Sequence, residues 1–186
     1  MTSPASVGDR ERLRIFCALR LPDEWLDGLV EWQRTIDTPP GVRLVARDNL
    51  HVTLAFLGHR PRDELEGVAT ALREAAAGAA QPVLRVVRYR ETRSVGMLVC
   101  DDEDGRAAAL ADDLHTRLER LGVYRREARP WLPHVTVLRF RERPRLRPPL
   151  PELGPASPSE AAAYLSVLRP TGAEYAVLES VALGRS

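Results

Sequence analysis

The sequence contains one short apolar stretch twice, and this repetition constrains the fold more than any other feature. The first copy, His-Val-Thr-Leu, occupies residues 51–54, and the second, His-Val-Thr-Val, occupies residues 134–137. Both copies are β-branched and apolar and lie in segments bounded by Gly or Pro, as is typical of strands. The chain is therefore expected to contain two equivalent strands, far apart in sequence.

Strand geometry predicts which side chains of each copy lie together. Successive side chains on a strand point to opposite faces. His51 and Thr53 therefore share one face, and the same alternation places His134 beside Thr136. The valines and leucines between them point into a core. If the two strands face each other across a groove, two imidazoles and two hydroxyls converge there.

The two copies resemble the paired His-x-Thr/Ser-x motifs of the 2H phosphoesterase superfamily, and more narrowly the bacterial and archaeal RNA 2′,3′-cyclic phosphodiesterases, once called 2′-5′ RNA ligases. The likeness runs from about Arg12 to Gly184 and includes residues 13–19 and 175–179. It implies an enzyme that opens the 2′,3′-cyclic phosphate of RNA ends and leaves a 2′-phosphate. It also implies weak reverse activity as a 2′-5′ ligase.

Such ring opening needs a base for the attacking water and an acid for the leaving ribose oxygen, on opposite sides of phosphorus. Histidine, with an ordinary pKa of about 6.5, serves either role near neutral pH. The strand alternation leaves the two roles open. The resemblance implies that His51 is the proton donor and His134 the acceptor. Thr53 and Thr136 can donate to the non-bridging oxygens, and no metal or cofactor is expected, because neither motif has a metal-ligand spacing.

Phe56 and Arg139 each stand five residues after a motif histidine. On a regular strand this odd offset points away from the groove. The two side chains can reach it only from a strand end or past a β-bulge. The resemblance implies that they stack on the terminal base of the substrate. A core aromatic and a surface arginine are the alternatives.

The order of the predicted elements indicates an α+β fold with long helices and antiparallel hairpins. Helices are expected to follow Pro22 and Pro61, and a third is expected to have Asp104 as its N-cap. The resemblance implies two pseudo-symmetric lobes, each an antiparallel sheet backed by helices, with the motif strands flanking a central cleft. Residues 1–11 are expected to form a disordered tail, and residues 12–186 a single bilobal domain.

The remaining polar features are assigned no catalytic role. The segment 141–159 is rich in Pro and Arg and is expected to be an extended loop. Its arginines could follow an RNA backbone, although all 27 basic residues of this chain are arginine, which weakens any cluster as a signal. His59 and His115 are expected to face solvent. Cys17 and Cys100 are expected to be buried free thiols.

The charge and hydropathy of the chain limit its partners. A formal net charge of +1 argues against a protein that coats long nucleic acid and fits one that binds RNA ends or short oligonucleotides. No apolar run approaches the ~18 residues of a membrane span, and the polar N-terminus is unlike a signal peptide. We therefore expect a cytoplasmic monomer.

Two other functions fit the same residues. One is the opening of a different cyclic phosphate, such as that of an ADP-ribose derivative, or the cleavage of a 2′-5′ oligoadenylate. The other is an RNA-end binding module without catalysis, which the completeness of both motifs disfavours.

Overall fold

The computed structural model describes residues 11–184. The tail predicted for residues 1–11 therefore lies outside the described residues except for Glu11. The Glu11 carbonyl oxygen accepts a hydrogen bond from the Arg62 backbone N–H at 3.1 Å, and its carboxylate pairs with the Arg62 guanidinium at 2.9 Å. Glu11 is thus attached to the fold rather than part of a free tail.

The described chain forms eight strands, three α-helices and two short 3-10 helices. In chain order they are β1 (Arg12–Arg20), α1 (Asp23–Arg34), β2 (Arg43–Leu44), η2 (Arg47–Asn49), β3 (Val52–Pro61), η3 (Arg62–Glu64), α2 (Leu65–Ala77), β4 (Leu84–Glu91), β5 (Val95–Asp102), α3 (Arg106–Arg120), β6 (His134–Arg139), β7 (Glu160–Arg169) and β8 (Gly172–Ala182). Among the described helices, none is long and apolar enough to cross a membrane.

All the strands belong to one antiparallel sheet in the order β4-β5-β6-β3-β1-β7-β8, with β2 added beside β6. The two motif strands, β3 and β6, are central neighbours, and the register pair that joins them is Val52 with Val135. The α+β class is confirmed. The prediction of a separate sheet in each lobe is not confirmed, because hydrogen bonds run across the join and make the sheet continuous.

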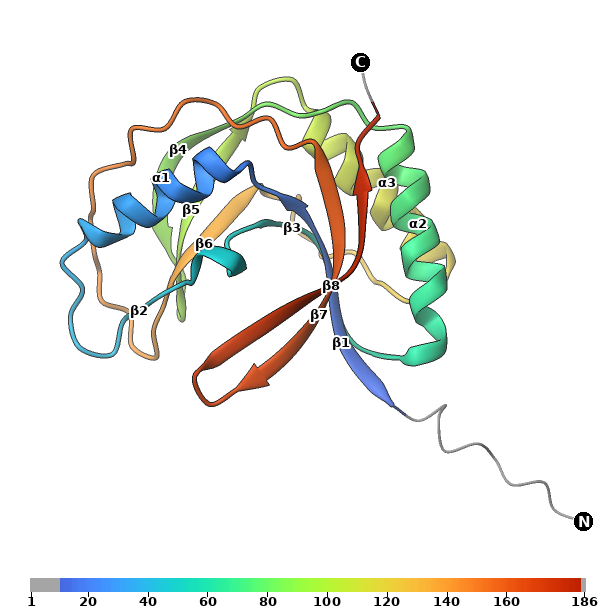
Figure 1. The fold of residues 1–186 in the computed structure, drawn as a ribbon, viewed down its shortest axis with the longest axis horizontal. Helices are drawn as coiled ribbons and strands as arrows, with labels where there is room; N and C mark the ends of the chain where they lie inside the picture. Colours follow the sequence, from blue (N-terminus) through green and yellow to red (C-terminus); the bar gives the residue numbers. More distant parts are fainter. Residues whose placement is uncertain (1–10, 185–186) are drawn as a thin grey trace, which may run out of the picture.

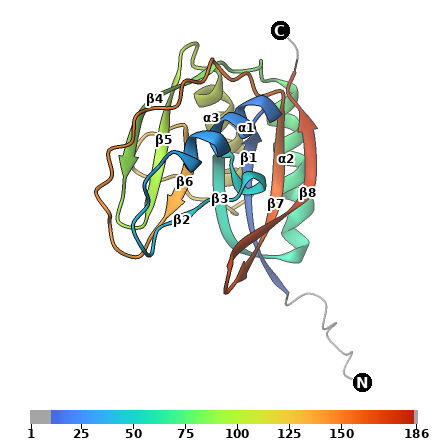
Figure 2. The ribbon, with the colours of Figure 1, turned by 60° about the vertical axis from the view of Figure 1, so that its left-hand side comes forward.

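The sheet is curled, and the β7–β8 hairpin projects from it (Figures 1 and 2). One face of the sheet carries the main core, in which apolar side chains of the strands meet those of all three helices. Strand residues such as Leu19, Val52 and Leu98 pack there with Leu29 of α1, Leu72 of α2 and Leu114 of α3. The helices thus cover one face, and the opposite face stays open for a site.

The third helix begins one residue later than its predicted cap. Gly105 holds the N-cap position with φ of 70°, a left-handed conformation that glycine adopts without strain. Two carboxylates satisfy the first helical N–H groups: Asp104 accepts from Arg106 at 3.2 Å, and Asp102 accepts from Ala107 at 3.2 Å and from Ala108 at 2.8 Å. The assignment of Asp104 to the N-cap position is therefore wrong by one residue, because Gly105 holds that position, although the Asp104 carboxylate still binds the first helical N–H group.

The Pro- and Arg-rich segment 141–159 contains no helix or strand, as predicted. It is nevertheless held at both ends. The indole N–H groups of Trp25 and Trp32 on α1 donate to carbonyl oxygens of Gly154 and Pro149 at 2.7 and 2.8 Å. The buried Glu91 carboxylate anchors its beginning. The segment is therefore an ordered strap across α1.

Candidate active site

The register pair at the join of the two motif strands places all four motif side chains on one face. Val52 and Val135 are directly opposite each other and fully buried. Residues opposite each other in an antiparallel pair point to the same face, and their chain neighbours point to the other. Four half-buried side chains therefore share the open face: His51, Thr53, His134 and Thr136.

The two histidines are held in the same way. His51 Nδ1 lies 2.8 Å from the Asn49 carbonyl oxygen, and His134 Nδ1 lies 2.8 Å from the Leu132 carbonyl oxygen. A carbonyl oxygen can only accept, so Nδ1–H donates in both rings. A neutral ring then has its lone pair on Nε2. His51 Nε2 lies 3.0 Å from Thr53 Oγ1.

Both motif strands contain a β-bulge at the same point, three residues after the histidine. In β3 the extra residue is Leu54, which falls between two register pairs with β1. In β6 it is Val137, which falls between two register pairs with β5. A bulge inserts one residue without advancing the partner strand. The alternation of side chains therefore shifts by one residue beyond each bulge.

This shift brings Phe56 and Arg139 onto the face that carries the histidines. Phe56 is opposite Phe16, whose ring stacks on His51 with centroids 4.9 Å apart. Phe56 is 49% exposed, so the alternative of a core aromatic is wrong. Arg139 is exposed and lies close enough for its charge to act on His51. Phe56 thus reaches the face past a bulge, and Arg139 reaches it past a bulge and at the end of β6.

Phe56 and Arg139 lie toward opposite ends of this face, because β3 and β6 run in opposite directions from their join. The guanidinium carbon of Arg14 lies 4.7 Å from the centroid of the Phe56 ring, in a cation–π contact. Arg14 is also hydrogen-bonded to Ser166. One side of the Phe56 ring is therefore already occupied by a cation.

An aromatic cluster that the sequence analysis missed surrounds His51. Besides Phe16, the ring of Tyr175 meets His51 edge to face at 5.5 Å, and the ring of Tyr164 lies 6.2 Å away. These rings come from β1, β7 and β8. The alternation of β1 was a usable signal, because Leu13, Ile15 and Cys17 share one face of the strand, which leaves Phe16 on the other face.

Burial against these rings changes the protonation of His51. The pKa of His51 is lowered from 6.5 to about 4, chiefly by desolvation; the hydrogen bond to Asn49 opposes this change, and the positive charges of Arg139 and His134 contribute to it. His51 is therefore neutral at pH 7 in the free protein.

Two buried polar side chains lie behind the motifs. His115 on α3 is only 5% exposed, and its Nε2 lies 2.7 Å from the Leu54 carbonyl oxygen. The prediction that His115 faces solvent is wrong, because this stretch of α3 packs directly on β3. Gln33 on α1 is 3% exposed and donates to the Val137 carbonyl oxygen at 2.8 Å. His59, by contrast, is exposed as predicted.

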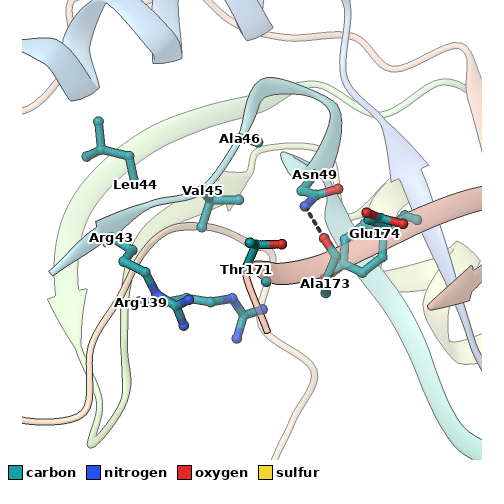
Figure 3. Close-up of a pocket in the computed structure, with 11 residues that line it drawn as sticks. Arg43, Leu44, Val45, Ala46, Asn49, Arg139, Thr171, Ala173 and Glu174 are labelled. Carbon is teal, nitrogen blue, oxygen red and sulfur yellow. Dashed lines mark hydrogen bonds between the residues drawn. The ribbon is translucent and has the colours of Figure 1, made fainter. Parts of the chain in front are cut away.

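A cavity of about 170 Å³ is lined by Asn49 and Tyr175, both of which also contact His51. Figure 3 shows this cavity. Arg43 and Arg139 line it on one side and the loop between β7 and β8 on the other. Asn49 joins the two sides, because its side-chain amide donates to the Ala173 carbonyl oxygen at 2.7 Å. The tip of the β7–β8 hairpin is thus docked next to the first motif.

The two cysteines are buried free thiols, as predicted. Burial raises the pKa of Cys17 and of Cys100 to about 12, so neither thiol is a nucleophile near neutral pH. Within residues 11–184, no three His, Cys, Asp or Glu side chains gather as a metal-ligand set.

Comparisons with known proteins show which family the chain belongs to. The family model "LigT like Phosphoesterase" matches residues 19–95. The RNA 2′,3′-cyclic phosphodiesterase of Escherichia coli K12 is 32% identical over 134 residues, which cover 69% of this chain and 73% of that protein. The RNA 2′,3′-cyclic phosphodiesterase of Thermus thermophilus is 32% identical over 183 residues, which cover 92% of this chain and 90% of that protein.

Solved structures show the same fold. The chain superposes on E. coli LigT complexed with 3′-AMP with a TM-score of 0.79 at 25% identity, covering 94% of this chain and all of that one. It superposes on the T. thermophilus protein TT0787 with a TM-score of 0.80 at 29% identity and the same coverage. This chain therefore belongs to the LigT-like phosphoesterase family of the 2H superfamily.

Proposed function

We propose that the protein is a metal-independent RNA 2′,3′-cyclic phosphodiesterase that hydrolyses cyclic-phosphate RNA ends to 2′-phosphate ends. The observation that carries this proposal is the placement of two Nδ1-anchored histidines and two threonines on one open face beside the Val52–Val135 join. The names of the curated relatives support the same reaction. In this proposal the enzyme acts as a cytoplasmic monomer on RNA ends or short oligonucleotides.

His134 is the proton acceptor in this mechanism. Its Nδ1–H is engaged with the Leu132 carbonyl oxygen, so the neutral ring has its lone pair on Nε2. That nitrogen can take a proton from water as the oxygen attacks phosphorus in line with the departing 3′ oxygen. General base assistance of this kind contributes on the order of 10²–10⁴-fold to the rate.

His51 is the proton donor, and it must gain its proton as substrate binds. Its pKa of about 4 leaves the ring neutral in the free protein at pH 7. A cyclic phosphate is an anion, and a negative charge next to an imidazole raises the imidazole pKa. Binding of substrate therefore draws a proton onto Nε2, which then passes to the 3′ oxygen as the P–O bond breaks.

The threonine hydroxyls stabilise the charge that builds on the non-bridging oxygens. Thr53 Oγ1 lies within hydrogen-bond distance of His51 Nε2 in the free protein, so it can turn toward phosphate once substrate is bound. Thr136 occupies the equivalent position next to His134. Fixed donors aimed at developing charge are among the largest contributions to such catalysis.

Phe56 and Arg139 bind the terminal nucleotide in this proposal. Because Arg14 occupies one side of the Phe56 ring, the ring can offer its other face to a base. Stacking on a ring or a guanidinium plane tolerates any base, as an enzyme acting on varied RNA ends requires.

The deciding experiment is incubation of the protein with an oligoribonucleotide ending in a 2′,3′-cyclic phosphate, in excess EDTA. We expect full turnover and a product that retains phosphate on the 2′ oxygen only. A 3′-phosphate product would contradict the assignment of the leaving oxygen, and loss of turnover in EDTA would contradict metal independence. Binding without any turnover would instead support the RNA-end binding module.

If a 5′-hydroxyl takes the place of water as the nucleophile, the same proton transfers join it to the cyclic-phosphate end while the 3′ oxygen leaves, which is 2′-5′ ligation. We expect this activity to be weak, because water is the more abundant nucleophile. A panel containing ADP-ribose cyclic phosphate and 2′-5′ oligoadenylate, measured beside the RNA substrate, tests the other phosphoesterase activities.

A further inference from the structure

In each motif strand, a buried side chain donates a hydrogen bond to the carbonyl oxygen of the residue three positions after the histidine. Gln33 Nε2 donates to the Val137 carbonyl oxygen at 2.8 Å, and His115 Nε2 donates to the Leu54 carbonyl oxygen at 2.7 Å. Val137 and Leu54 are the bulge residues of β6 and β3, each three residues after its motif histidine. The two hydrogen bonds are therefore equivalent contacts in the two halves of the site.

The donors come from the opposite halves of the chain. Helix α1 connects β1 to the first motif, yet its Gln33 binds the bulge of the second motif on β6. Helix α3 connects β5 to the second motif, yet its His115 binds the bulge of the first motif on β3. Figure 1 shows α1 on the side of β5 and β6 and α3 on the other side of the molecule. Each half therefore supports the motif of the other half.

The position of each donor matters because a bulge breaks the regular hydrogen-bond ladder. The bulge residue determines whether the side chain two positions later points to the core or to the open face. On β6 the Gln33 amide also donates to the Val45 carbonyl oxygen at 3.0 Å, which ties the segment after β2 to the bulge. At the β3 bulge, His115 is itself held by Tyr124, whose ring packs against the His115 ring with centroids 4.8 Å apart.

We propose that Gln33 and His115 are positioning residues, which fix the two bulges and thereby direct Arg139 and Phe56 into the cleft. The proposal rests on the proposed function, in which Arg139 and Phe56 bind the terminal nucleotide. Gln33 acts through Arg139 alone, and His115 acts through Phe56 alone. If Gln33 and His115 were merely structural, replacing them would weaken the fold, and the loss of activity would not depend on whether Arg139 or Phe56 is present.

Double-mutant cycles test the pairing. Gln33→Met and His115→Leu remove the donors, and each is combined with Arg139→Ala and with Phe56→Ala. We expect Gln33→Met to lower kcat/KM for a cyclic-phosphate-ended oligonucleotide on the order of tenfold in the wild-type and Phe56→Ala backgrounds, but less than about twofold in the Arg139→Ala background. His115→Leu should show the mirror pattern.

Equal losses in all backgrounds would overturn the proposal. His115→Gln retains a side-chain N–H donor and should restore most of the activity that His115→Leu loses. Where a variant unfolds, His115→Gln and Gln33→Asn are measured in the same cycles. The affinity for adenosine 2′-monophosphate is a second readout that needs no turnover. If the wild type binds this nucleotide but turns over no substrate, the proposed function fails while the cycles still test the pairing.

A different observation concerns the cavity beside His51. Arg43 on β2 and Arg139 on β6 are directly opposite each other in register. Like charges at opposite positions destabilise a strand pair, and within residues 11–184 neither guanidinium has a carboxylate partner. Glu174 also lines the cavity but pairs with Arg169 at 3.1 Å. Figure 3 shows both arginine side chains along the same side of the cavity.

This cavity is continuous with the surroundings of the first motif. Tyr175 lines the cavity and also meets the His51 ring, and Asn49 lines it and also accepts the His51 Nδ1–H. We infer that Arg43 binds the internucleotide phosphate that precedes the cyclic end, while Arg139 beside it contacts the terminal nucleotide. Under the proposed function, the substrate class is then an oligoribonucleotide rather than a mononucleotide.

Arg43→Gln tests this second inference, with Arg125→Gln as the matched control on an exposed loop. We expect Arg43→Gln to lower kcat/KM about tenfold for a trinucleotide with a cyclic end, and to leave a cyclic mononucleotide unchanged. For the trinucleotide, the slope of log(kcat/KM) against log[salt] should become less steep by about 0.7 in the variant, because one phosphate contact is lost. Equal effects on both substrates, or none, would overturn the inference, whereas inactivity of the wild type on both would overturn the proposed function.

Discussion

At the scale of single residues, the site is two copies of one arrangement that differ in their surroundings. Both histidines donate through Nδ1 to the carbonyl two residues earlier. Only His51 lies against the rings of Phe16, Tyr164 and Tyr175. The aromatic surroundings, rather than the motif, therefore separate the two histidines chemically.

Replacing either motif histidine should abolish most turnover. We expect His51→Ala and His134→Ala each to lower kcat on the order of 10²–10⁴-fold, because each removes one partner in proton transfer. Single-turnover kinetics with a cyclic-phosphate-ended oligonucleotide measure the loss. His59→Ala, at an exposed position, is the control and should keep wild-type activity. Full activity in either motif variant would refute the mechanism.

The protonation of His51 can be followed directly. In the free protein its ring should titrate near pH 4, because burial against aromatic rings disfavours the imidazolium. Adding adenosine 2′-monophosphate should move the midpoint upward, and so should Phe16→Ala, which admits water to the ring. NMR titration of the ring carbons measures all three midpoints. A free-protein midpoint at or above the ordinary 6.5 would contradict the role of desolvation.

The same pKa predicts how stability depends on pH. The pKa of His51 is lower in the folded protein than in the unfolded chain, so between pH 4 and 6.5 the unfolded chain binds more protons. Stability should therefore rise with pH across this window and be lost as pH falls from 6.5 toward 4. The contribution is on the order of 1–3 kcal/mol. His51→Gln should remove it, giving a flatter plot of Tm against pH than the wild type.

At the scale of elements, the bulges in β3 and β6 and the β7–β8 hairpin shape the cleft. The bulges bring Phe56 and Arg139 to the open face, and the hairpin supplies Tyr175. The hairpin tip is attached to η2 by the bond from Asn49 to Ala173. The cleft therefore depends on contacts between elements that are distant in sequence.

Asn49→Ala should release the hairpin tip. The lost hydrogen bond is worth about 0.5–1.5 kcal/mol, so global stability should change little. Hydrogen exchange at the amides of residues 171–175 should quicken, and KM should rise because Tyr175 no longer stays beside His51. Asn49→Asp, which keeps the shape but removes the donor, should behave like the alanine variant. Unchanged exchange at the tip would show that other contacts hold it.

At the scale of the whole molecule, buried polar groups attach the long segment 141–159 to the body. The Glu91 carboxylate accepts from the backbone N–H groups of Arg145 and Leu146 at 2.9 and 2.7 Å, and pairs with Arg143 at 3.1 Å. The tryptophans of α1 bind the later part of the segment. This strap closes one end of the curled sheet.

Glu91→Ala should free the strap, because four donors lose one buried acceptor. We expect a stability loss of about 2–4 kcal/mol and rapid trypsin cleavage within residues 141–147. The wild type should resist cleavage there under the same conditions. Time courses of limited proteolysis, with cleavage sites identified by mass spectrometry, measure the difference. Arg85→Ala removes only an exposed ion pair with Glu103 and serves as the control.

Local patterns in the sequence predicted much of this protein. The strand alternation placed His51 with Thr53 and His134 with Thr136, because side-chain direction on a strand depends only on position along it. Helix starts after Pro22 and Pro61 followed from similarly local chemistry. The resemblance carried by the two motifs identified the family.

Tertiary structure alone decided the rest. Whether Phe56 and Arg139 reach the cleft depends on bulges, and a bulge is a property of two paired strands, not of one. His115 was assigned to solvent because nothing within α3 reveals that Leu54, 61 residues earlier, presents a carbonyl oxygen to it. Local periodicity determines which face of a strand or helix each side chain occupies. Register and long-range hydrogen bonds determine which of these faces come together, and the candidate active site lies where they do.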